Sequence, residues 1–517
     1  MESLADTPWD VTISGTGLAQ SLLALALSRS GKNVLHVDKN PYYGGPEAAF
    51  SLQEAEEWVN RVNNETGDHS FEDASVWRGD GSSEGGTQLS ASRAYTLSLS
   101  PQLIYARSQL IPTLVSSKVH RQLEFQAVGS WWIHRPGDSG DKRLYRVPGS
   151  REDIFADDML SVKSKRTLMR FIRHIGQTQQ SSDEAEGEGS SLEEEVGDVS
   201  LTEYLTSKFK VPDELHTPLL SLCLSQASPQ QTSAQYAVSR IKRHLTSLGV
   251  YGSGFGSLTV KWGGGSEISQ VGCRALAVGG GVYVLNTGIK SLSHLAEDSN
   301  GEGARIQLSL SNEEVIKTKF VVGSNWDLPT SARSSCDCDR VARSISVVSS
   351  SLGSLFPTTA EGGPVPVGAV VAFPGAALGQ ADDSPPVYIL VHSSETGECP
   401  TGQCVLYGSV SISGSDGQAL IESAVQQLLE SAAGPDAKVL WSLRYTQLGR
   451  AIGSETGSVQ SVNLADRIVR LPPSSLDLAF DDSLIDTVKD AWQAIMGDDA
   501  IDHEFMTFED REGAYEE

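Results

Sequence analysis

The sequence predicts an α/β protein that begins with a dinucleotide-binding βαβ unit and carries an all-helical segment in its middle. Two observations support this class. Residues 10–38 follow a strand–helix–strand pattern with a glycine-rich turn between the first strand and the helix. Between about residues 150 and 250 lies a run of helix-like segments, and the sequence on both sides of that run is rich in strand patterns.

The composition is that of an ordinary globular chain with a strong acidic excess. The 517 residues suffice for roughly two to four domains with cores of their own. The net charge of −26 argues against a nucleic-acid surface, which needs clustered Lys and Arg. It is compatible with a basic protein partner, although solubility alone would explain it. The six cysteines form neither a disulfide framework nor a zinc-spaced set.

The targeting features predict a cytoplasmic protein. The N-terminal stretch MESLADTPWD is acidic rather than apolar, which is not the pattern of a signal peptide. The longest apolar stretch, residues 365–379, is short and interrupted by prolines, so we do not expect it to span a bilayer. The last residues, REGAYEE, carry no prenylation cysteine.

The βαβ unit is the clearest local pattern. DVTIS is a short β run, and the leucines of LAQSLLALALSRS recur at helical spacing. Gly31 is placed to end that helix, and NVLHVD follows as a second buried strand. Because the two strands are joined by a helix, a parallel sheet is expected.

The remaining elements are predicted from local periodicity. We expect a polar loop or insertion at 63–88, a helix at 99–118, a hairpin at 122–150, helices at 162–175, 201–209, 213–226 and 233–249, strands near 280–286, 305–324, 366–373, 386–392 and 403–412, and helices at 417–432 and 483–496. The helix at 233–249 directs Arg240, Lys242 and Arg243 away from its apolar face. Residues 181–198 hold eight acids and no base, which predicts a disordered loop.

The turn SGTGLAQ begins as a dinucleotide-binding fingerprint and then departs from it. Gly15 and Gly17 stand where the tight turn and the approach of a pyrophosphate require glycine, and Asp38 has the offset of a ribose-binding acid. Gln20 occupies the place of the third glycine, and Pro46 stands where many flavin enzymes have arginine after two glycines. The usual glycine-rich flavin segment near the C-terminus is missing as well. We therefore expect no bound cofactor, and Gly15, Gly17 and Asp38 are interpreted as vestigial.

No catalytic constellation is apparent in the sequence. The ten histidines are scattered without an HxxxH or His/Cys cluster, and no Gly-x-Ser-x-Gly elbow occurs. We therefore expect neither catalytic nor metal-ligating residues, and no enzyme activity of the chain itself.

Several blocks resemble the Rab escort protein and Rab GDP-dissociation-inhibitor superfamily. The first is ISGTGLAQSLLALALSRSGKNVLHVDKNPYYGG near the N-terminus, and the second is SEISQVGCRALAVGGGVYVLN at 266–286. Residues 103–125, 145–172 and 439–448 are also similar to the family, so the resemblance runs in order along most of the chain. It implies a flavoprotein-like FAD/NAD(P)-binding fold that holds no flavin.

The resemblance also implies a domain organisation and a binding surface. A large discontinuous domain with mixed sheets would comprise residues 1–150 and 251–517, and a smaller all-α domain would comprise 151–250. One face of the large domain would bind the switch surface of a GDP-bound Rab GTPase. The residues that match this platform are Tyr42, Tyr43, Glu267, Arg274, Tyr283 and Val284. Without the resemblance, Glu267 and Arg274 would be interpreted as a surface ion pair and Tyr43 as a packing residue.

The helical domain has two tasks implied by the resemblance. It would shelter the geranylgeranyl chain of a bound Rab and dock the Rab geranylgeranyltransferase heterodimer. Candidate lining residues of the lipid groove are Phe171, Leu219, Leu222 and Cys223, and candidate transferase contacts are Leu201 and Tyr204. For any one of the four lining candidates, an ordinary helix-bundle core is the favoured alternative. The two transferase contacts rest on alignment with the family alone.

The function implied is that of a Rab escort protein, which presents new Rab GTPases for C-terminal prenylation and delivers them to membranes by transient association. The helix-end sequence SRSG, the segment LIYARS and the two polar insertions favour an escort protein over an inhibitor. Two alternatives stay open: a Rab GDP-dissociation inhibitor, and an FAD-dependent oxidoreductase with a broken fingerprint.

Overall fold

The βαβ unit forms as the sequence predicts. The structure is a computed structural model, and it describes residues 4–64, 69–79, 88–135, 143–149, 151–158, 160–177, 199–252, 254–295, 305–333, 338–358, 362–450 and 466–509. Strand β1 (Trp9–Ser14) is followed by helix α1 (Leu18–Arg29) and strand β2 (Val34–Val37). β1 and β2 pair in parallel. Nearly every residue of α1 is buried, because helices α11 (Gly265–Val278) and α13 (Ser483–Met496) pack against it.

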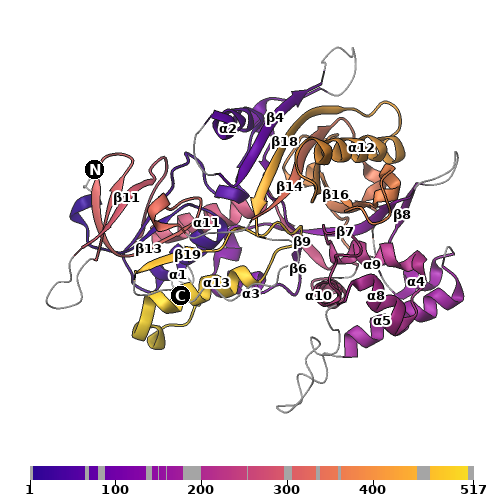
Figure 1. The fold of residues 1–517 in the computed structure, drawn as a ribbon, viewed down its shortest axis with the longest axis horizontal. Helices are drawn as coiled ribbons and strands as arrows, with labels where there is room; N and C mark the ends of the chain where they lie inside the picture. The colour runs from indigo at the N-terminus through magenta and orange to yellow at the C-terminus, as the bar shows by residue number, and fades with distance from the viewer. Residues whose placement is uncertain are drawn as a thin grey trace.

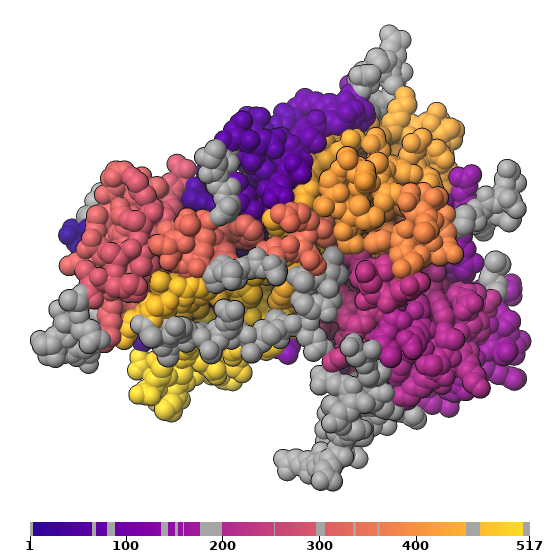
Figure 2. Space-filling model, viewed as in Figure 1, coloured from indigo at the N-terminus to yellow at the C-terminus, as the bar shows by residue number. Residues whose placement is uncertain are grey.

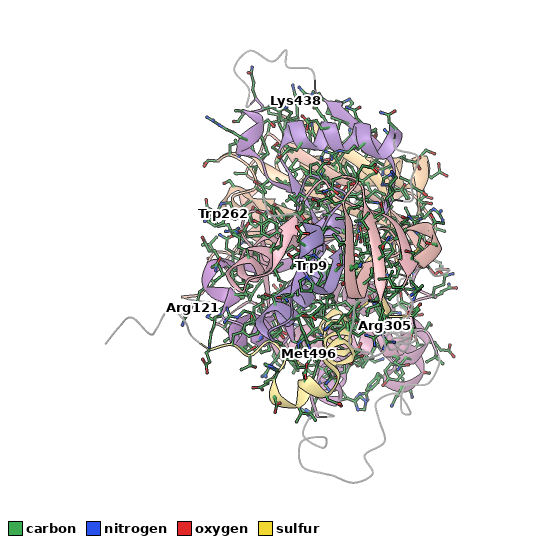
Figure 3. The ribbon with its side chains drawn as sticks, turned by 90° about the vertical axis from the view of Figure 1, so that its left-hand side faces the viewer. Trp9, Arg121, Trp262, Arg305, Lys438 and Met496 are labelled. Carbon is green, nitrogen blue, oxygen red and sulfur yellow. The ribbon has the colours of Figure 1, made fainter. Side chains whose placement is uncertain are left out.

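The first sheet is built around this unit and is mixed. Its strands lie in the order β10 (Val282–Val284), β2, β1, β13 (Val315–Ser324), β12 (Ile306–Leu310) and β11 (Ile289–His294), and β19 (Ile468–Leu471) also pairs with β13. The pairings from β10 to β13 are parallel, whereas β12 and β11 continue the sheet antiparallel. Trp9, buried at the start of β1, lies in the middle of the molecule in the side view of Figure 3.

A second, longer sheet forms the other half of the strand-rich body (Figure 1). Its strands lie in the order β4 (Phe71–Arg78), β18 (Val439–Gly449), β14 (Asp339–Val348), β17 (Cys404–Val410), β16 (Val387–Ser393), β15 (Gly368–Phe373), β7 (Phe125–His134), β9 (Ser257–Val260) and β6 (Ile104–Tyr105), and β8 (Leu144–Arg146) pairs with β7. Strands from both halves of the sequence are therefore interleaved in this sheet.

The second sheet is covered on both faces. Ala369 and Val371 of β15 pack into a core beneath helix α12 (Gly414–Ala432). Val370 and Ala372, which alternate with them, pack on the opposite face into the core shared with the central helices and with α2 (Leu52–Asn64). This alternation is the period of two expected for a strand that is buried on both sides.

The central helices form one lobe, drawn in magenta at the lower right of Figure 2. They are α4 (Arg151–Ala156), α5 (Val162–Gln177), α8 (Leu201–Tyr204) with the π turn Leu205–Phe209, the short turn Asp213–Leu215, α9 (His216–Cys223) and α10 (Ala234–Ser247). The helices predicted at 162–175, 201–209, 213–226 and 233–249 are thus present. The acidic run 181–198 lies outside the described residues, and the domain boundaries at 150 and 250 stay a prediction.

Two local predictions were wrong. The stretch 63–88, expected to be a polar loop or insertion, contains strand β4, whose polar side chains face outward at the edge of the sheet. Of the helix expected at 99–118, α3 (Leu110–Ser116) forms, whereas β6 occupies earlier residues because they pair with β9. Arg240 lies away from the apolar face of α10, as predicted, and is largely buried there in an ion pair with Asp477.

Candidate functional site

The glycine-rich turn keeps the backbone of a dinucleotide fingerprint but is filled by the chain's own side chains. Gly15 has a φ of +90°, and its carbonyl oxygen lies 2.6 Å from His36 Nε2. A Cβ at Gly15 would lie 2.5 Å from the Asp327 carboxylate, which occupies that space. Gln20, the residue in place of the third glycine, donates from Nε2 to this same carboxylate at 3.1 Å. The departure at Gln20 therefore belongs to an internal hydrogen-bond network.

The N-terminus of α1 already holds an anion from within the chain. The Leu18 backbone amide donates to Glu47 Oε2 at 3.1 Å, and Ser474 Oγ donates to Glu47 Oε1 at 3.3 Å. Burial raises the pKa of Glu47 to about 7, against an ordinary value of 4.5. A helix N-terminus of this kind is where a dinucleotide-binding protein holds the pyrophosphate. Here the carboxylate of Glu47 occupies that position.

Asp38, which has the offset of a ribose-binding acid, is committed to the backbone. Its Oδ2 accepts hydrogen bonds from the backbone amide of Thr16 at 2.7 Å and from Thr16 Oγ1 at 2.6 Å. Its Oδ1 accepts from the Asn40 amide at 2.7 Å. Burial raises the pKa of Asp38 to about 6. Asp38 therefore links the fingerprint turn to the end of β2. Both of its carboxylate oxygens already accept hydrogen bonds from within the chain.

These residues do not fit a dinucleotide. The cavity beside Gln20, Glu47 and Ser474 measures about 50 Å³, whereas sites for drug-sized ligands measure ~300 Å³ or more. A phosphate placed at α1 would also face the Glu47 carboxylate. The fold of a dinucleotide-binding enzyme is thus present, but its phosphate position is closed, which argues against an FAD-dependent oxidoreductase.

The structure brings four of the six predicted platform residues together. Tyr43, in the loop after β2, makes an edge contact with Tyr283 of β10, with ring centroids 5.8 Å apart. On α11, Arg274 pairs at 3.0 Å with Glu267, which lies about two helical turns earlier. Burial raises the pKa of Tyr43, and the charge of Arg274 is close enough to oppose this increase. We call Tyr43, Glu267, Arg274 and Tyr283 the tyrosine–arginine cluster.

This cluster combines segments that are more than two hundred residues apart in the sequence. They meet because β10 pairs in parallel with β2, which places Tyr283 opposite His36, and because α11 leads directly into β10. The Arg274 side chain is 54% exposed, whereas that of Glu267 is 18% exposed. An arginine presented by a half-buried partner beside two tyrosines is the composition typical of a protein-binding surface.

The other two predicted platform residues lie elsewhere. Tyr42 turns away from Tyr43 and makes an edge contact with Phe50 at 4.8 Å, within the core beneath α2. Val284 follows Tyr283 on β10 and packs on the opposite face of the first sheet. Successive residues of a strand point to opposite faces, so Tyr283 and Val284 cannot share one surface. Tyr42 and Val284 therefore make packing contacts apart from the cluster, and their assignment to the platform stays a prediction.

The helical lobe contains a large apolar cavity of about 380 Å³ that is open to solvent on one side. Its wall is formed by residues of α5, α9 and α10 and by the segment after β8, among them Met169, Leu219, Leu222, Ile241 and Leu245. Two of the four predicted lining residues, Leu219 and Leu222, lie in this wall. Apolar walls and this volume are the properties of a site for an apolar ligand.

The other helical residues singled out from the sequence are core residues. Phe171 is fully buried and makes an edge contact with Phe209, and the thiol of Cys223 donates to the Leu220 carbonyl at 3.0 Å. Burial raises the pKa of Cys223 to about 12. Leu201 and Tyr204 are 0% and 3% exposed, so neither side chain reaches the surface to contact a transferase. All four side chains pack in the core of this structure, and their roles in lipid or transferase binding stay predictions.

Sequence reasoning missed the residues that close the phosphate position. Glu47 directly follows Pro46, the position at which many flavin enzymes have arginine. An acid next to that position was a signal that the sequence offered. Asp327 lies about three hundred residues from Gly15, and no local pattern connects it to the turn. Within the described residues, no cluster of His, Cys, Asp and Glu could hold a metal ion.

The fold and the closed phosphate position define a protein of flavoprotein-like fold whose phosphate position is filled by its own side chains. The model of the family described as GDP dissociation inhibitor matches residues 5–432, and the chain belongs to this family. The resemblance seen in the sequence is thereby confirmed. Among solved structures, a Rab GDI from Plasmodium falciparum superposes with a TM-score of 0.63 at 17% identity, covering 95% of this chain and 98% of the other, and an oxidoreductase from Methanosarcina mazei with 0.55 at 14% identity, covering 94% and 99%.

Curated relatives come from both branches of the family. A Rab proteins geranylgeranyltransferase component A from Candida albicans is 29% identical over 77% of this chain and 59% of its own length. One from Drosophila melanogaster is 27% identical over 92% and 87%. A Rab GDP-dissociation inhibitor from Saccharomyces cerevisiae is 24% identical over 77% and 78%. The chain thus spans less than two thirds of the Candida relative. In the part of the chain that the structure describes, no helix combines the length and apolarity needed to cross a bilayer.

Proposed function

We propose that this chain is a Rab escort protein: it binds GDP-bound Rab GTPases, presents them to Rab geranylgeranyltransferase, and delivers the prenylated product to membranes through transient contact. The observation that carries the proposal is the presence, in one molecule, of the exposed tyrosine–arginine cluster and of a 380 Å³ apolar cavity. A carrier of a lipidated protein needs both a surface for the protein and a cavity for the lipid.

The two ligands, a Rab protein and its geranylgeranyl chain, require different kinds of site. Tyr and Arg are among the side chains that most often dominate the energy of a protein interface, and here Tyr43 contacts Tyr283 and lies near Arg274. A geranylgeranyl chain gains about 0.8 kcal/mol for each CH₂ that leaves water, so an unsheltered chain drives its protein into membranes. The cavity between α5, α9 and α10 offers an apolar alternative to the bilayer.

The chain would act as an accessory component and not as a catalyst. The transferase would form the thioether, while this chain would hold the Rab in place. The relatives named component A of a Rab geranylgeranyltransferase support an accessory role. A cytoplasmic location is part of the proposal, because both partners would meet the chain there.

The test is prenylation of a GDP-bound Rab by purified transferase with and without this chain. Radiolabelled geranylgeranyl diphosphate serves as donor, and transferred label is counted against time. We expect incorporation that depends on the chain and saturates at stoichiometric amounts. If the Rab is modified equally well in its absence, or not at all in its presence, the escort function is refuted.

A second candidate is a Rab GDP-dissociation inhibitor, which the Saccharomyces relative over 77% of this chain favours. An inhibitor would remove prenylated Rab from vesicles without supporting its prenylation. Both assays should therefore be run on the same preparation. Extraction combined with failure to support prenylation would select the inhibitor.

A further inference from the structure

A second recess adjoins the apolar cavity in the helical lobe. It measures about 40 Å³ and shares Val147, Leu222 and Leu248 with the wall of the larger cavity. It lies where β7, the segment after β8 and the end of α10 meet. A space of this size holds a few waters or one small polar group, and it is too narrow for the bulk of a lipid chain.

The wall of this recess is polar in an otherwise apolar region. Ser130, Trp131 and His244 line it and are 7%, 6% and 3% exposed. Within the described part of the chain, Ser130 Oγ, Trp131 Nε1 and His244 Nδ1 have no hydrogen-bond partner. Buried polar atoms are nearly always paired, and three unpaired ones around one recess indicate a missing ligand or ordered water.

The chemistry of the wall favours a ligand that accepts hydrogen bonds. The indole N–H of Trp131 can only donate, and the Ser130 hydroxyl can donate as well. Arg146, also in the wall, contributes a cation. The Asp153 carboxylate lies in the wall too, but it already accepts from the Gly149 amide at 3.1 Å. Donors and one cation therefore outnumber acceptors.

His244 can also donate a hydrogen bond into the recess. Its ring makes edge contacts with Trp131 and Tyr105, with centroids 4.6 and 5.8 Å away. Burial lowers the pKa of His244 to about 4, so the imidazole is neutral at physiological pH and can donate from one nitrogen. An anion in the recess would favour the protonated form and raise that pKa.

We propose that the recess and the apolar cavity form one site for a single-chain lipid that ends in a carboxylate. The chain lies in the cavity, and the carboxylate accepts hydrogen bonds from Ser130, Trp131 and Arg146. The inference rests on the proposed function for its source of ligand, a geranylgeranylated cysteine at the end of a Rab. A free fatty acid has the same chemistry, and the test separates the two sources.

The test uses the full chain alone, without Rab or transferase. Calorimetric titrations compare N-acetyl-S-geranylgeranyl-cysteine, its methyl ester and palmitate. We expect the acid to bind at least tenfold more tightly than the ester, because esterification removes the charge that Arg146 faces and crowds the recess. Trp131→Phe and Arg146→Gln should each remove most of this preference, because each takes a donor away from the carboxylate. Thermal melts confirm that the variants fold.

Arg143→Gln is the matched control. Arg143 lies just before β8, pairs with Glu430 at 3.8 Å on the surface, and does not line the recess. It should retain the full preference for the acid. If palmitate binds more tightly than the prenylcysteine and shows the same sensitivity to Arg146→Gln, the site is a carboxylate site whose ligand is a fatty acid.

Two results would overturn the inference. The first is equal binding of acid and ester, and the second is an acid preference that survives both variants. Neither bears on the prenylation assay, which uses Rab and transferase and can succeed independently. Conversely, a clear acid preference together with failed prenylation would leave the recess assigned and refute the escort function.

Discussion

Arg240 of α10 forms an ion pair with Asp477, in the segment between β19 and α13, and the two side chains are only 12% and 10% exposed. The Tyr236 hydroxyl donates to the same carboxylate at 2.9 Å. Five residues further along, Asp482 pairs with Arg243 at 3.1 Å. Ion pairs thus connect the polar side of α10 to the segment that contains Asp477 and Asp482. The apolar side of α10 lines the apolar cavity of the helical lobe.

Arg240→Ala should destabilise the fold strongly. Removing the arginine leaves Asp477 buried without its counter-charge, which costs ~3–5 kcal/mol in comparable pairs. Urea denaturation followed by circular dichroism measures the change in the free energy of unfolding. Lys242→Ala on the same helix is the control and should change stability by no more than about 0.5 kcal/mol. Equal stability of the Arg240 variant and the parent would show that the pair is not formed in solution.

Tyr43→Ala and Arg274→Ala should each weaken binding of GDP-loaded Rab. Truncating an interface anchor of this kind costs ~2 kcal/mol, or roughly thirtyfold in affinity. Titration against a fluorescent GDP-bound Rab measures the effect, and circular dichroism confirms the fold. Lys290→Ala serves as control, because Lys290 lies on β11 in an exposed pair with Glu313. Parent-like binding by both cluster variants would remove the assignment of this surface.

Filling the apolar cavity should impair lipid binding but not Rab binding. Leu219→Trp places a larger side chain in the wall, and the cavity loses part of its 380 Å³. We expect at least a tenfold loss of affinity for a geranylgeranylated Rab peptide, measured by fluorescence, with affinity for unprenylated Rab within about twofold. Leu114→Met, in a core outside the helical lobe, controls for general effects of core substitution. Undiminished peptide binding would place the lipid elsewhere.

Glu47→Gln should change the pH dependence of stability. Burial raises the pKa of Glu47 from 4.5 to about 7, so the folded state holds this proton more tightly than the unfolded state. The resulting stabilisation is full below pH 4.5 and is lost as the pH rises to 7, a difference of about 3 kcal/mol. The glutamine variant lacks this loss, so it should gain stability relative to the parent between pH 4.5 and 8. Parallel denaturation curves across that range test this, and a constant difference would contradict it.

The purified protein should carry no flavin. Glu47 occupies the phosphate position at α1, and Asp38 is bound to Thr16 and Asn40. An absorption spectrum between 350 and about 500 nm, a range in which flavins absorb, is the measurement, with added FAD as a second arm. A stoichiometric band, or saturable binding of FAD, would restore the oxidoreductase as a candidate.

The elements of the fold that depend on local sequence patterns could be predicted from the sequence. The βαβ unit was predicted because apolar periodicity, Gly15 and the helix-ending Gly31 lie within thirty residues. The hairpin of β7 and β8 and the central helices were found for the same reason. Strand β4 was missed because half of its side chains face water at a sheet edge, so its composition resembles that of a loop.

The sequence by itself determined the family, the βαβ start and the identity of the cluster residues Tyr43, Glu267 and Arg274. Only the tertiary structure decided which side chains share a surface. It set Tyr42 and Val284 apart from that cluster, buried Arg240 against Asp477, and closed the fingerprint turn with Asp327. The physical reason is distance along the chain. No local period relates Arg240 to Asp477 or Gly15 to Asp327, and these residues meet only when distant strands and helices pack together.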